Sequence, residues 1–305
     1  MLEVRAFAKI NVHLSVHGRR PDGFHELTTV FQTVGLADTL SLAPADGPLA
    51  LRCPGSDLPE DASNLVMRAA TALAEELGRP LPEGFRFTLH KQIPTQAGLG
   101  GGSADAVAAM RALAALWGEE AAPDLLARVG RRLGSDVPFF AFGGTALGQG
   151  RGDQVTRLPD LPPMAVVIAR PSFGVPTADA YRWLAASRSD AGKGAEASAG
   201  GPADLAWPST ADGWPGRLAA CHNDFEPVVC ARHPEIAAGI RLLREAGARL
   251  ACLSGSGSAI VGLFADEVAA EAAAAPFAAR PGWRCWLTQT VDAAAYARDA
   301  APRRI

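Results

Sequence analysis

Hydrophobic and polar residues alternate along the first part of the chain, which is typical of β-strands. Between residues 4 and 17, one face is apolar and the opposite face is mostly polar. The apolar face carries Ala8, Ile10, Val12, Leu14 and Val16, and the opposite face carries Phe7, Lys9, Asn11 and His13. The pattern predicts a half-buried strand with a polar sheet face. Shorter runs at 27–36, 39–43 and 85–93 predict further strands.

Apolar residues recur with helical spacing in other segments. Asp61 to Asn64 precede a helical pattern over 65–77, which ends at Gly78. Further helices are predicted over 104–117, 123–133, 223–231, 234–246 and 266–279, and further strands over 164–169 and 259–264. The chain is therefore expected to mix strands and helices throughout its length.

The length of 305 residues suggests two domains or lobes. Pro162 and Pro163 mark the expected boundary, which gives lobes of residues 1–161 and 162–305. Residues 187–216 are rich in Gly, Ser, Ala and Pro and have little periodicity, so this segment is predicted to be a mobile loop or insertion.

Composition excludes several classes of function. Lys and Arg number 29 against 32 Asp and Glu, a net charge of −3, whereas nucleic-acid binders normally carry a strong basic excess. The sequence has no run of about twenty apolar residues and no secretory leader pattern, so no membrane partner is expected. Its five cysteines are scattered without a Cys-x-x-Cys pair, which indicates reduced thiols and a cytoplasmic protein.

His13 and His17 have the spacing of a metalloprotease pair, but the position that needs Glu is Leu14. On a strand these two histidines would lie about 13 Å apart, too far for one metal ion. A polar sheet face explains them better.

The strongest chemical signal is a glycine-rich loop between a predicted strand and a long predicted helix. It runs from Pro94 to Ser103 and contains four glycines in five residues. Glycines let backbone N–H groups approach a ligand, and a helix N-terminus favours negative charge, so the loop indicates a phosphate site. Ser103 is the expected N-cap of the following helix.

Other phosphate and nucleophile motifs do not match this loop. A Walker loop requires Gly-Lys-Ser/Thr, the dinucleotide fingerprint requires Gly where Ser103 stands, and the protein-kinase and Gly-x-Ser-x-Gly motifs are absent. The structural alternative is a tight turn between strand and helix. A second loop, Ser254 to Ser258, precedes a strand and is a weak signal alone, but paired with the first loop it could close over the same ligand.

Four blocks occur in the order found in the GHMP kinases, the superfamily of galactose, homoserine, mevalonate and phosphomevalonate kinases. They are Ala8–Asn11, residues 94–106, Gly134–Pro138 and Leu253–Ala259. The resemblance implies an α+β GHMP-kinase fold with two lobes and an active site in the cleft between them, the nucleotide belonging to the N-terminal lobe. Within the superfamily, the segments Gly98–Ser103, Arg20–Leu27 and Asn223–Glu226 resemble the branch that phosphorylates 4-diphosphocytidyl-2-C-methyl-D-erythritol.

That resemblance implies transfer of the ATP γ-phosphoryl group to the 2-hydroxyl of the methylerythritol unit, a step in the non-mevalonate route to isoprenoid precursors. Asp136 resembles the catalytic base and Lys9 the catalytic lysine, a cation that would keep Asp136 ionised. Their structural alternatives are a turn or N-cap aspartate and a solvated strand lysine.

The implied cofactors are ATP and Mg²⁺. The candidate nucleotide-binding residues are Asn64, Pro94, Ala97, Gly98, Leu99, Gly100, Gly101, Gly102 and Ser103. Asn64 has an equally good explanation as a helix N-cap. Asp105 either helps to hold Mg²⁺ or complements the helix dipole, so no residue is assigned as a metal ligand.

The implied partner is a small molecule, a cytidine-diphosphate-linked methylerythritol; the oligomeric state stays undecided. The candidate substrate-binding residues are Asn11, Phe24, His25, Tyr181, Gly255, Ser256 and Gly257. His25 resembles the residue that bonds the cytosine edge, and Phe24 stands where the family often has Tyr, which keeps stacking but loses a hydroxyl. Tyr181 is the candidate for the other face of the base, with a core aromatic as its alternative.

Two other functions compete with this interpretation. Another GHMP kinase, of the homoserine or mevalonate type, would not need Phe24 and His25 as a base clamp. A non-catalytic nucleotide sensor on the same fold would be expected to lack the base or the lysine, whereas Asp136 and Lys9 are both present.

Overall fold

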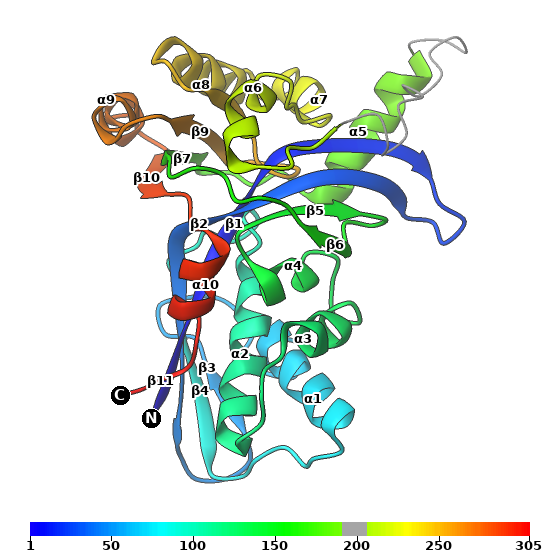
Figure 1. Cartoon of the computed structure of the whole chain (residues 1–305), viewed down its shortest axis with the longest axis vertical. Coiled ribbons are helices and arrows are strands. Elements are labelled where there is room, and N and C mark those ends of the chain that lie inside the picture. Colours follow the sequence, from blue (N-terminus) through cyan, green and yellow to red (C-terminus); the bar gives the residue numbers. More distant parts are fainter. Residues whose placement is uncertain (191–205) are drawn as a thin grey trace.

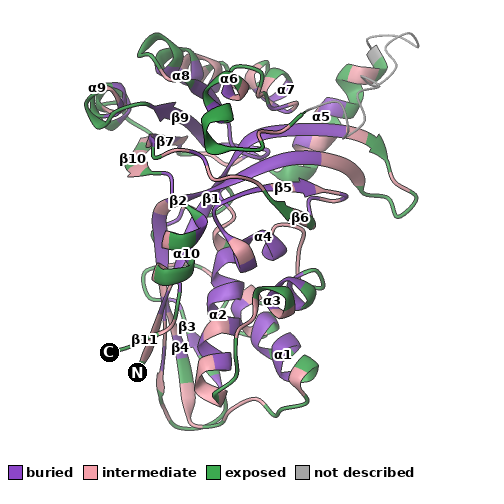
Figure 2. Ribbon diagram, viewed as in Figure 1, coloured by how far each residue is buried: buried purple, intermediate pink, exposed green. Residues whose placement is uncertain are grey.

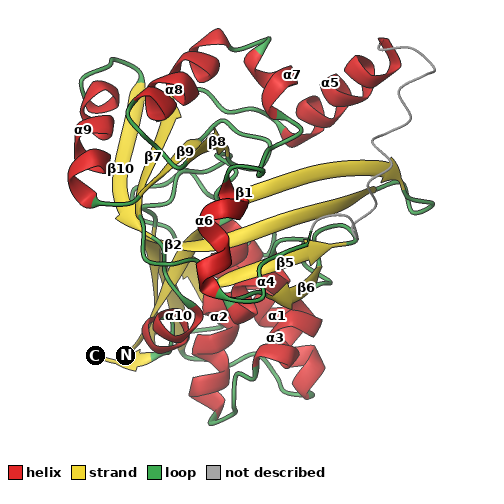
Figure 3. Ribbon diagram, turned by 45° about the horizontal axis from the view of Figure 1, so that its top comes forward, coloured by secondary structure: helices red, strands yellow, loops and turns green. Residues whose placement is uncertain are grey.

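The computed structural model describes residues 1–190 and 206–305, and the described chain is built on two sheets (Figures 1 and 3). The larger sheet has seven strands in the order β11-β1-β2-β4-β3, with β5 added to β2 and β6 to β5. These strands are β1 Leu2–Arg19, β2 His25–Pro44, β3 Ala50–Arg52, β4 Phe85–His90, β5 Thr145–Gln149, β6 Gln154–Arg157 and β11 Arg303–Arg304.

The smaller sheet is antiparallel, in the order β10-β7-β9-β8. Its strands are β7 Ala165–Pro171, β8 Leu250–Leu253, β9 Ile260–Phe264 and β10 Trp283–Gln289. The described helices are α1 Leu65–Leu77, α2 Gly101–Trp117, α3 Pro123–Gly130, α4 Val137–Phe142, α5 Thr177–Asp190, α6 Trp214–Leu218, α7 Glu226–Cys230, α8 Pro234–Glu245, α9 Glu267–Ala278 and α10 Ala293–Asp299, with a 3₁₀ turn η1 at Ala211–Gly213. The mixture of helices and sheets confirms the α+β prediction.

The first helix forms as its sequence predicts. The Asn64 side chain accepts a hydrogen bond from the Val66 amide, and Gly78 ends the helix with a φ of 62°. Helix α2 differs, because it begins at Gly101 and its N-cap is Gly100, with a φ of 70°. The prediction that Ser103 caps this helix is wrong: Ser103 lies inside the first turn, because the left-handed glycine ends the preceding loop earlier.

Strand β1 is buried on both faces, so the prediction of a half-buried strand is wrong (Figure 2). Lys9, Asn11 and His13 are each at most 3 % exposed. Their face of the strand packs inside the protein instead of facing water. The two runs predicted at 27–36 and 39–43 are one continuous strand, β2, which pairs with β1 as a long antiparallel hairpin.

Residues at the end of the chain contact the sheet of the N-terminal half. Strand β11 pairs with β1, and the Tyr296 ring on α10 lies 5.7 Å from the Phe7 ring, so the end of the chain returns to the first sheet (Figure 1). The division at 161/162 stays a prediction.

The prediction of a loop over 187–216 is wrong at 187–190 and 211–216, whereas 206–210 form neither helix nor strand, as predicted. Helix α5 continues to Asp190, and η1 with the start of α6 occupies 211–216, where Trp214 is fully buried. The rest of that segment, 191–205, lies outside the described residues.

Candidate active site

Lys9 and Asn11 are neighbours on one face of β1, and both are buried. Lys9 Nζ donates a hydrogen bond of 2.7 Å to Asn11 Oδ1 and lies 3.3 Å from Asp136 Oδ2. The Lys9 side chain is 4 % exposed and that of Asp136 is 36 % exposed. Lys9 is therefore not a solvated strand lysine.

Asp136 occupies the N-cap position of α4, yet its side chain makes no capping hydrogen bond. Pro138 lies in the first turn, where a missing N–H costs nothing. The helix thus starts without using the carboxylate, which is directed to Lys9. The alternative of a capping aspartate is wrong for this side chain.

The first glycine loop surrounds a cavity of about 340 Å³ with Leu65 and Lys91. A β-carbon added to Gly100 would meet the Phe140 ring at 2.7 Å and Lys9 Cγ at 3.0 Å. The Lys9 amide also donates to the Leu99 carbonyl at 3.0 Å. The loop therefore packs directly against the strand that carries Lys9. Residues 94 and 97–103, the predicted nucleotide-binding loop, all line its cavity.

The two glycine loops are in contact. The Ser254 hydroxyl donates to the Gly98 carbonyl at 3.1 Å, and the Ala259 amide donates to the Ala97 carbonyl at 3.2 Å. The sequence could only suggest that the loops act as a pair. In the structure, Gly255 and Ser256 line the cavity beside them, while Gly257 is not among its lining residues.

That second cavity, the substrate cavity, has a volume of about 600 Å³. Its lining includes Lys9, Asn11, Phe24, His25, Gly98, Asp136, Tyr181, Gly255 and Ser256. Gly98 lines both this cavity and that of the glycine loop. The two spaces consequently meet at one backbone position, close to Lys9 and Asp136.

Aromatic rings form the far part of the substrate cavity. The rings of His25 and Tyr181 stack with centroids 4.7 Å apart, and Tyr181 also meets Phe225 edge-on at 4.8 Å. Phe24 is 52 % exposed, and the Arg151 guanidinium lies 4.9 Å from its ring centroid. Burial and the nearby arginines lower the pKa of His25, which favours a neutral imidazole able to donate and accept.

Comparison with known proteins identifies the family. The models of the GHMP kinases N-terminal domain and C-terminal domain match residues 64–144 and 209–281. The 4-diphosphocytidyl-2-C-methyl-D-erythritol kinase of Moorella thermoacetica is 43% identical over 267 residues, covering 87% of this chain and 91% of that protein. The chain belongs to the 4-diphosphocytidyl-2-C-methyl-D-erythritol kinase family.

Solved structures agree with this family assignment. A crystal structure of a 4-(cytidine 5'-diphospho)-2C-methyl-D-erythritol kinase has a TM-score of 0.73 and 35% identity, covering 94% of this chain and 98% of that chain. A homoserine kinase from Cytophaga hutchinsonii has a TM-score of 0.68 at 22% identity, covering 99% and 97%, which shows the shared GHMP fold alone. The chain is thus a kinase of the GHMP superfamily.

Two residues that the family resemblance singled out do not line these cavities. Asn64 is used as a helix cap, and its Nδ2 donates to the Pro59 carbonyl at 2.7 Å. Asp105 is buried and accepts a 2.6 Å hydrogen bond from Lys91 Nζ. Burial raises the pKa of Asp105 to about 8, and neither residue is among those that line the two cavities.

Several kinase residues at the site carry no motif in the sequence. Thr29 accepts a hydrogen bond of 2.8 Å from Asn11 Nδ2 and donates to the His13 carbonyl, which orients the Asn11 amide. Arg151, Thr177 and Phe225 line the substrate cavity, and Lys91 lines the nucleotide-loop cavity. The one sequence signal for the contact between Thr29 and Asn11 is that Thr29 lies on the predicted strand that follows β1.

Within residues 1–190 and 206–305, no helix is long and apolar enough to cross a membrane. In the same ranges, no group of three or more His, Cys, Asp or Glu side chains is arranged to hold a metal ion.

Proposed function

We propose that this protein transfers the γ-phosphoryl group of ATP to the 2-hydroxyl of 4-diphosphocytidyl-2-C-methyl-D-erythritol. One observation carries the proposal: Lys9 and Asp136 form an ion pair where the glycine-loop cavity and the substrate cavity meet at Gly98. The family relatives carry this kinase name, and the reaction consumes ATP in the non-mevalonate formation of isoprenoid precursors.

The nucleotide belongs in the first glycine loop. Its backbone N–H groups and the N-terminus of α2 favour a triphosphate, and Lys91 lines the same cavity. Gly98 and Gly100 have positive φ, and a β-carbon at either would strike neighbouring protein atoms, so only glycine fits this course of the backbone. A loop of this kind lets backbone N–H groups approach phosphate oxygens. Mg²⁺ bound to the ATP phosphates would supply charge neutralisation, and Mg²⁺ in such sites keeps several waters and takes few protein ligands.

The phosphoryl acceptor belongs in the substrate cavity. Asn11 Oδ1 already accepts from Lys9, and its Nδ2 donates to Thr29, so the amide is fixed beside the reacting groups. In the transfer, a bond forms between the 2-hydroxyl oxygen and the γ-phosphorus, and the bond from the γ-phosphorus to the bridging oxygen of ADP breaks. Asp136 takes the proton of the hydroxyl, and Lys9 stabilises the negative charge on the oxygen.

The cytidine end belongs with the aromatic residues. Phe24, His25 and Tyr181 line one part of the cavity, and the neutral form of His25 suits hydrogen bonding to a base edge. The five free cysteines suit a reducing, cytoplasmic location.

Incubation with ATP and the cytidine substrate, followed by phosphorus NMR, tests this function. The expected product carries one new phosphomonoester, with ADP formed in equal amount. Homoserine and mevalonate serve as alternative acceptors. Phosphorylation of either in preference to the cytidine substrate, or binding of ATP with no transfer to any acceptor, would refute the proposal.

A further inference from the structure

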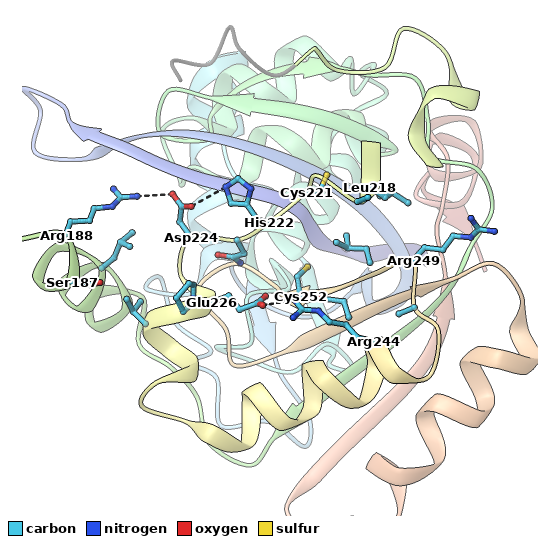
Figure 4. A pocket seen from close by; sticks show the side chains of 18 residues that line it. Ser187, Arg188, Leu218, Cys221, His222, Asp224, Glu226, Arg244, Arg249 and Cys252 are labelled. Atoms are coloured by element: carbon cyan, nitrogen blue, oxygen red, sulfur yellow. Dashed lines mark hydrogen bonds and ion pairs between the residues drawn. The ribbon is translucent and has the colours of Figure 1, made fainter. Parts of the chain in front are cut away.

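A third cavity, which we call the rear cavity, lies next to the substrate cavity. Its volume is about 690 Å³, and it is lined by parts of α5, α6, α7, α8 and β8 (Figure 4). The segment from His222 to Glu226 separates the two spaces. Phe225 lines the substrate cavity, whereas His222, Asp224 and Glu226 line the rear cavity.

The ionic groups of the rear cavity pair with each other. Arg188 Nη2 lies 2.9 Å from Asp224 Oδ2, and Arg244 Nη2 lies 2.8 Å from Glu226 Oε1. Figure 4 shows these arginines on opposite sides of the cavity, so they do not converge on one ligand. The same carboxylates also reach into the protein: Asp224 Oδ2 accepts from the Val16 amide at 2.8 Å, and Glu226 Oε2 accepts from the Leu253 amide at 3.1 Å.

Asn223 is hydrogen-bonded to the start of the second glycine loop. Its Nδ2 donates to the carbonyls of Leu253 and Gly255, each at 2.8 Å, and its Oδ1 accepts from the Phe225 amide at 2.9 Å. The residue is 4 % exposed. Both amide hydrogens are therefore used to hold the start of one loop.

The loop that Asn223 holds has further contacts: Ser254 Oγ donates to the Gly98 carbonyl at 3.1 Å, and Ser258 Oγ donates to the Phe173 carbonyl at 2.6 Å. Gly255 has a φ of 56° and lies against Gly98, and Ser256 Oγ bonds Thr177 Oγ1 at 3.0 Å. Because Gly255 and Ser256 line the substrate cavity, a shift of the Gly255 carbonyl would alter the wall that the substrate meets.

We propose that Asn223 is a positioning residue, which sets the place of Gly255 and Ser256 for the phosphoryl acceptor; this rests on the proposed function. Glu226 supports the same loop from the Leu253 amide. The residue acts on the acceptor through the glycine loop and has no part in the proton transfer. Its removal should therefore weaken acceptor binding more than nucleotide binding or turnover.

The test is Asn223→Asp, which keeps the shape of the side chain but places a carboxylate oxygen where an amide donates to two carbonyls. We expect the KM for the cytidine substrate to rise at least tenfold, while the KM for ATP and kcat change less than threefold. Amide hydrogen exchange of residues 253–257 should become at least tenfold faster, with residues 65–77 unchanged.

The matched control is Asp266→Ala, which removes the N-cap of α9, where the side chain accepts from the Ala269 amide. This variant should lower the melting temperature and leave both KM values unchanged. If Asn223→Asp does not fold, Glu226→Ala replaces it, with an expected threefold rise in the acceptor KM alone.

Parallel changes in both KM values, or unchanged exchange at residues 253–257 in a folded variant, would overturn the role of Asn223. A lack of phosphorylation by the unaltered protein would instead overturn the proposed function. The exchange measurement would then still test the contact between Asn223 and the loop.

Discussion

A β-carbon on Gly98 would lie 2.0 Å from the carbonyl oxygen of Ser254, so the two backbones are in direct contact, and the Ser254 hydroxyl also donates to the Gly98 carbonyl. Each belongs to a different glycine loop, and Gly98 lines both the nucleotide-loop cavity and the substrate cavity. The contact places the two loops side by side where the lining of the two cavities is shared. A side chain at this point would force the loops apart.

Gly98→Ala should therefore damage both stability and activity. The new methyl group meets backbone atoms, and Gly98 has a φ of 78°, which alanine adopts only with strain. We expect a loss of about 2 kcal/mol or more in the free energy of unfolding and a fall in kcat/KM for ATP of at least tenfold. Urea denaturation and steady-state kinetics measure the two effects.

Gly78→Ala provides the control for this substitution. Gly78 also has a positive φ, of 62°, but a β-carbon there meets no atom within 4 Å. It should cost about 1 kcal/mol from backbone strain alone and leave the kinetics unchanged. Equal stability losses in the two variants would contradict the importance of the contact between the loops.

Asp136→Asn should abolish most of the phosphorylation while leaving nucleotide binding intact. The amide cannot accept the hydroxyl proton as a base, and the loss of a general base commonly costs about 10²- to 10⁴-fold in rate. Side-chain capping of α4 is not affected, because Asp136 makes no such bond. Turnover measured by ADP release, with ATP binding by calorimetry, distinguishes the two effects. Near-normal turnover would exclude Asp136 as the base; Asp212→Asn, an exposed change, is the control.

Tyr181→Leu should weaken binding of the cytidine substrate. It removes an aromatic ring from the lining of the substrate cavity, and one aromatic contact with a bound base contributes roughly 1 kcal/mol, or about fivefold in KM. Tyr181→Phe keeps the ring and should stay within twofold of the unaltered protein. Initial rates at varied cytidine substrate and saturating ATP provide the comparison. Equal KM values for all three proteins would show that Tyr181 is only a core aromatic.

His13 makes stability depend on pH. Burial, followed by the neighbouring His222, lowers the pKa of His13 to about 3 from 6.5. The folded state therefore holds the neutral ring, while the unfolded state takes up a proton below pH 6.5. The stability that His13 contributes is fully present above pH 6.5 and is lost as pH falls from there towards 3.

Between pH 7.5 and 5.0 this loss amounts to about 2 kcal/mol. Urea denaturation at both pH values should show a smaller difference for His13→Gln than for the unaltered protein. His90→Gln, at an exposed strand end, should keep the original difference. A His13→Gln profile that matches the parent would mean that His13 is not held neutral in the fold.

Local elements followed from the sequence because their signals are local. The helix over 65–77 was predicted with its cap and its end, since Asn64 and Gly78 act on residues next to them. The start of α2 was misplaced because Ser103 is a good cap by type, but the left-handed Gly100 begins the helix earlier. Alternation along β1 indicated the strand but not its second buried face, because burial there depends on partners from distant segments.

The sequence by itself determined the glycine loops, the candidate base and lysine, and the family to which they belong. Only the tertiary structure decided that Lys9 lies 3.3 Å from Asp136, that Gly98 touches Ser254, and that Asn223 holds the second loop. It also decided that Asn64 and Asp105 are used within the fold. The physical reason is that residue type and spacing report the local backbone, whereas contacts between distant segments arise only when the whole core packs.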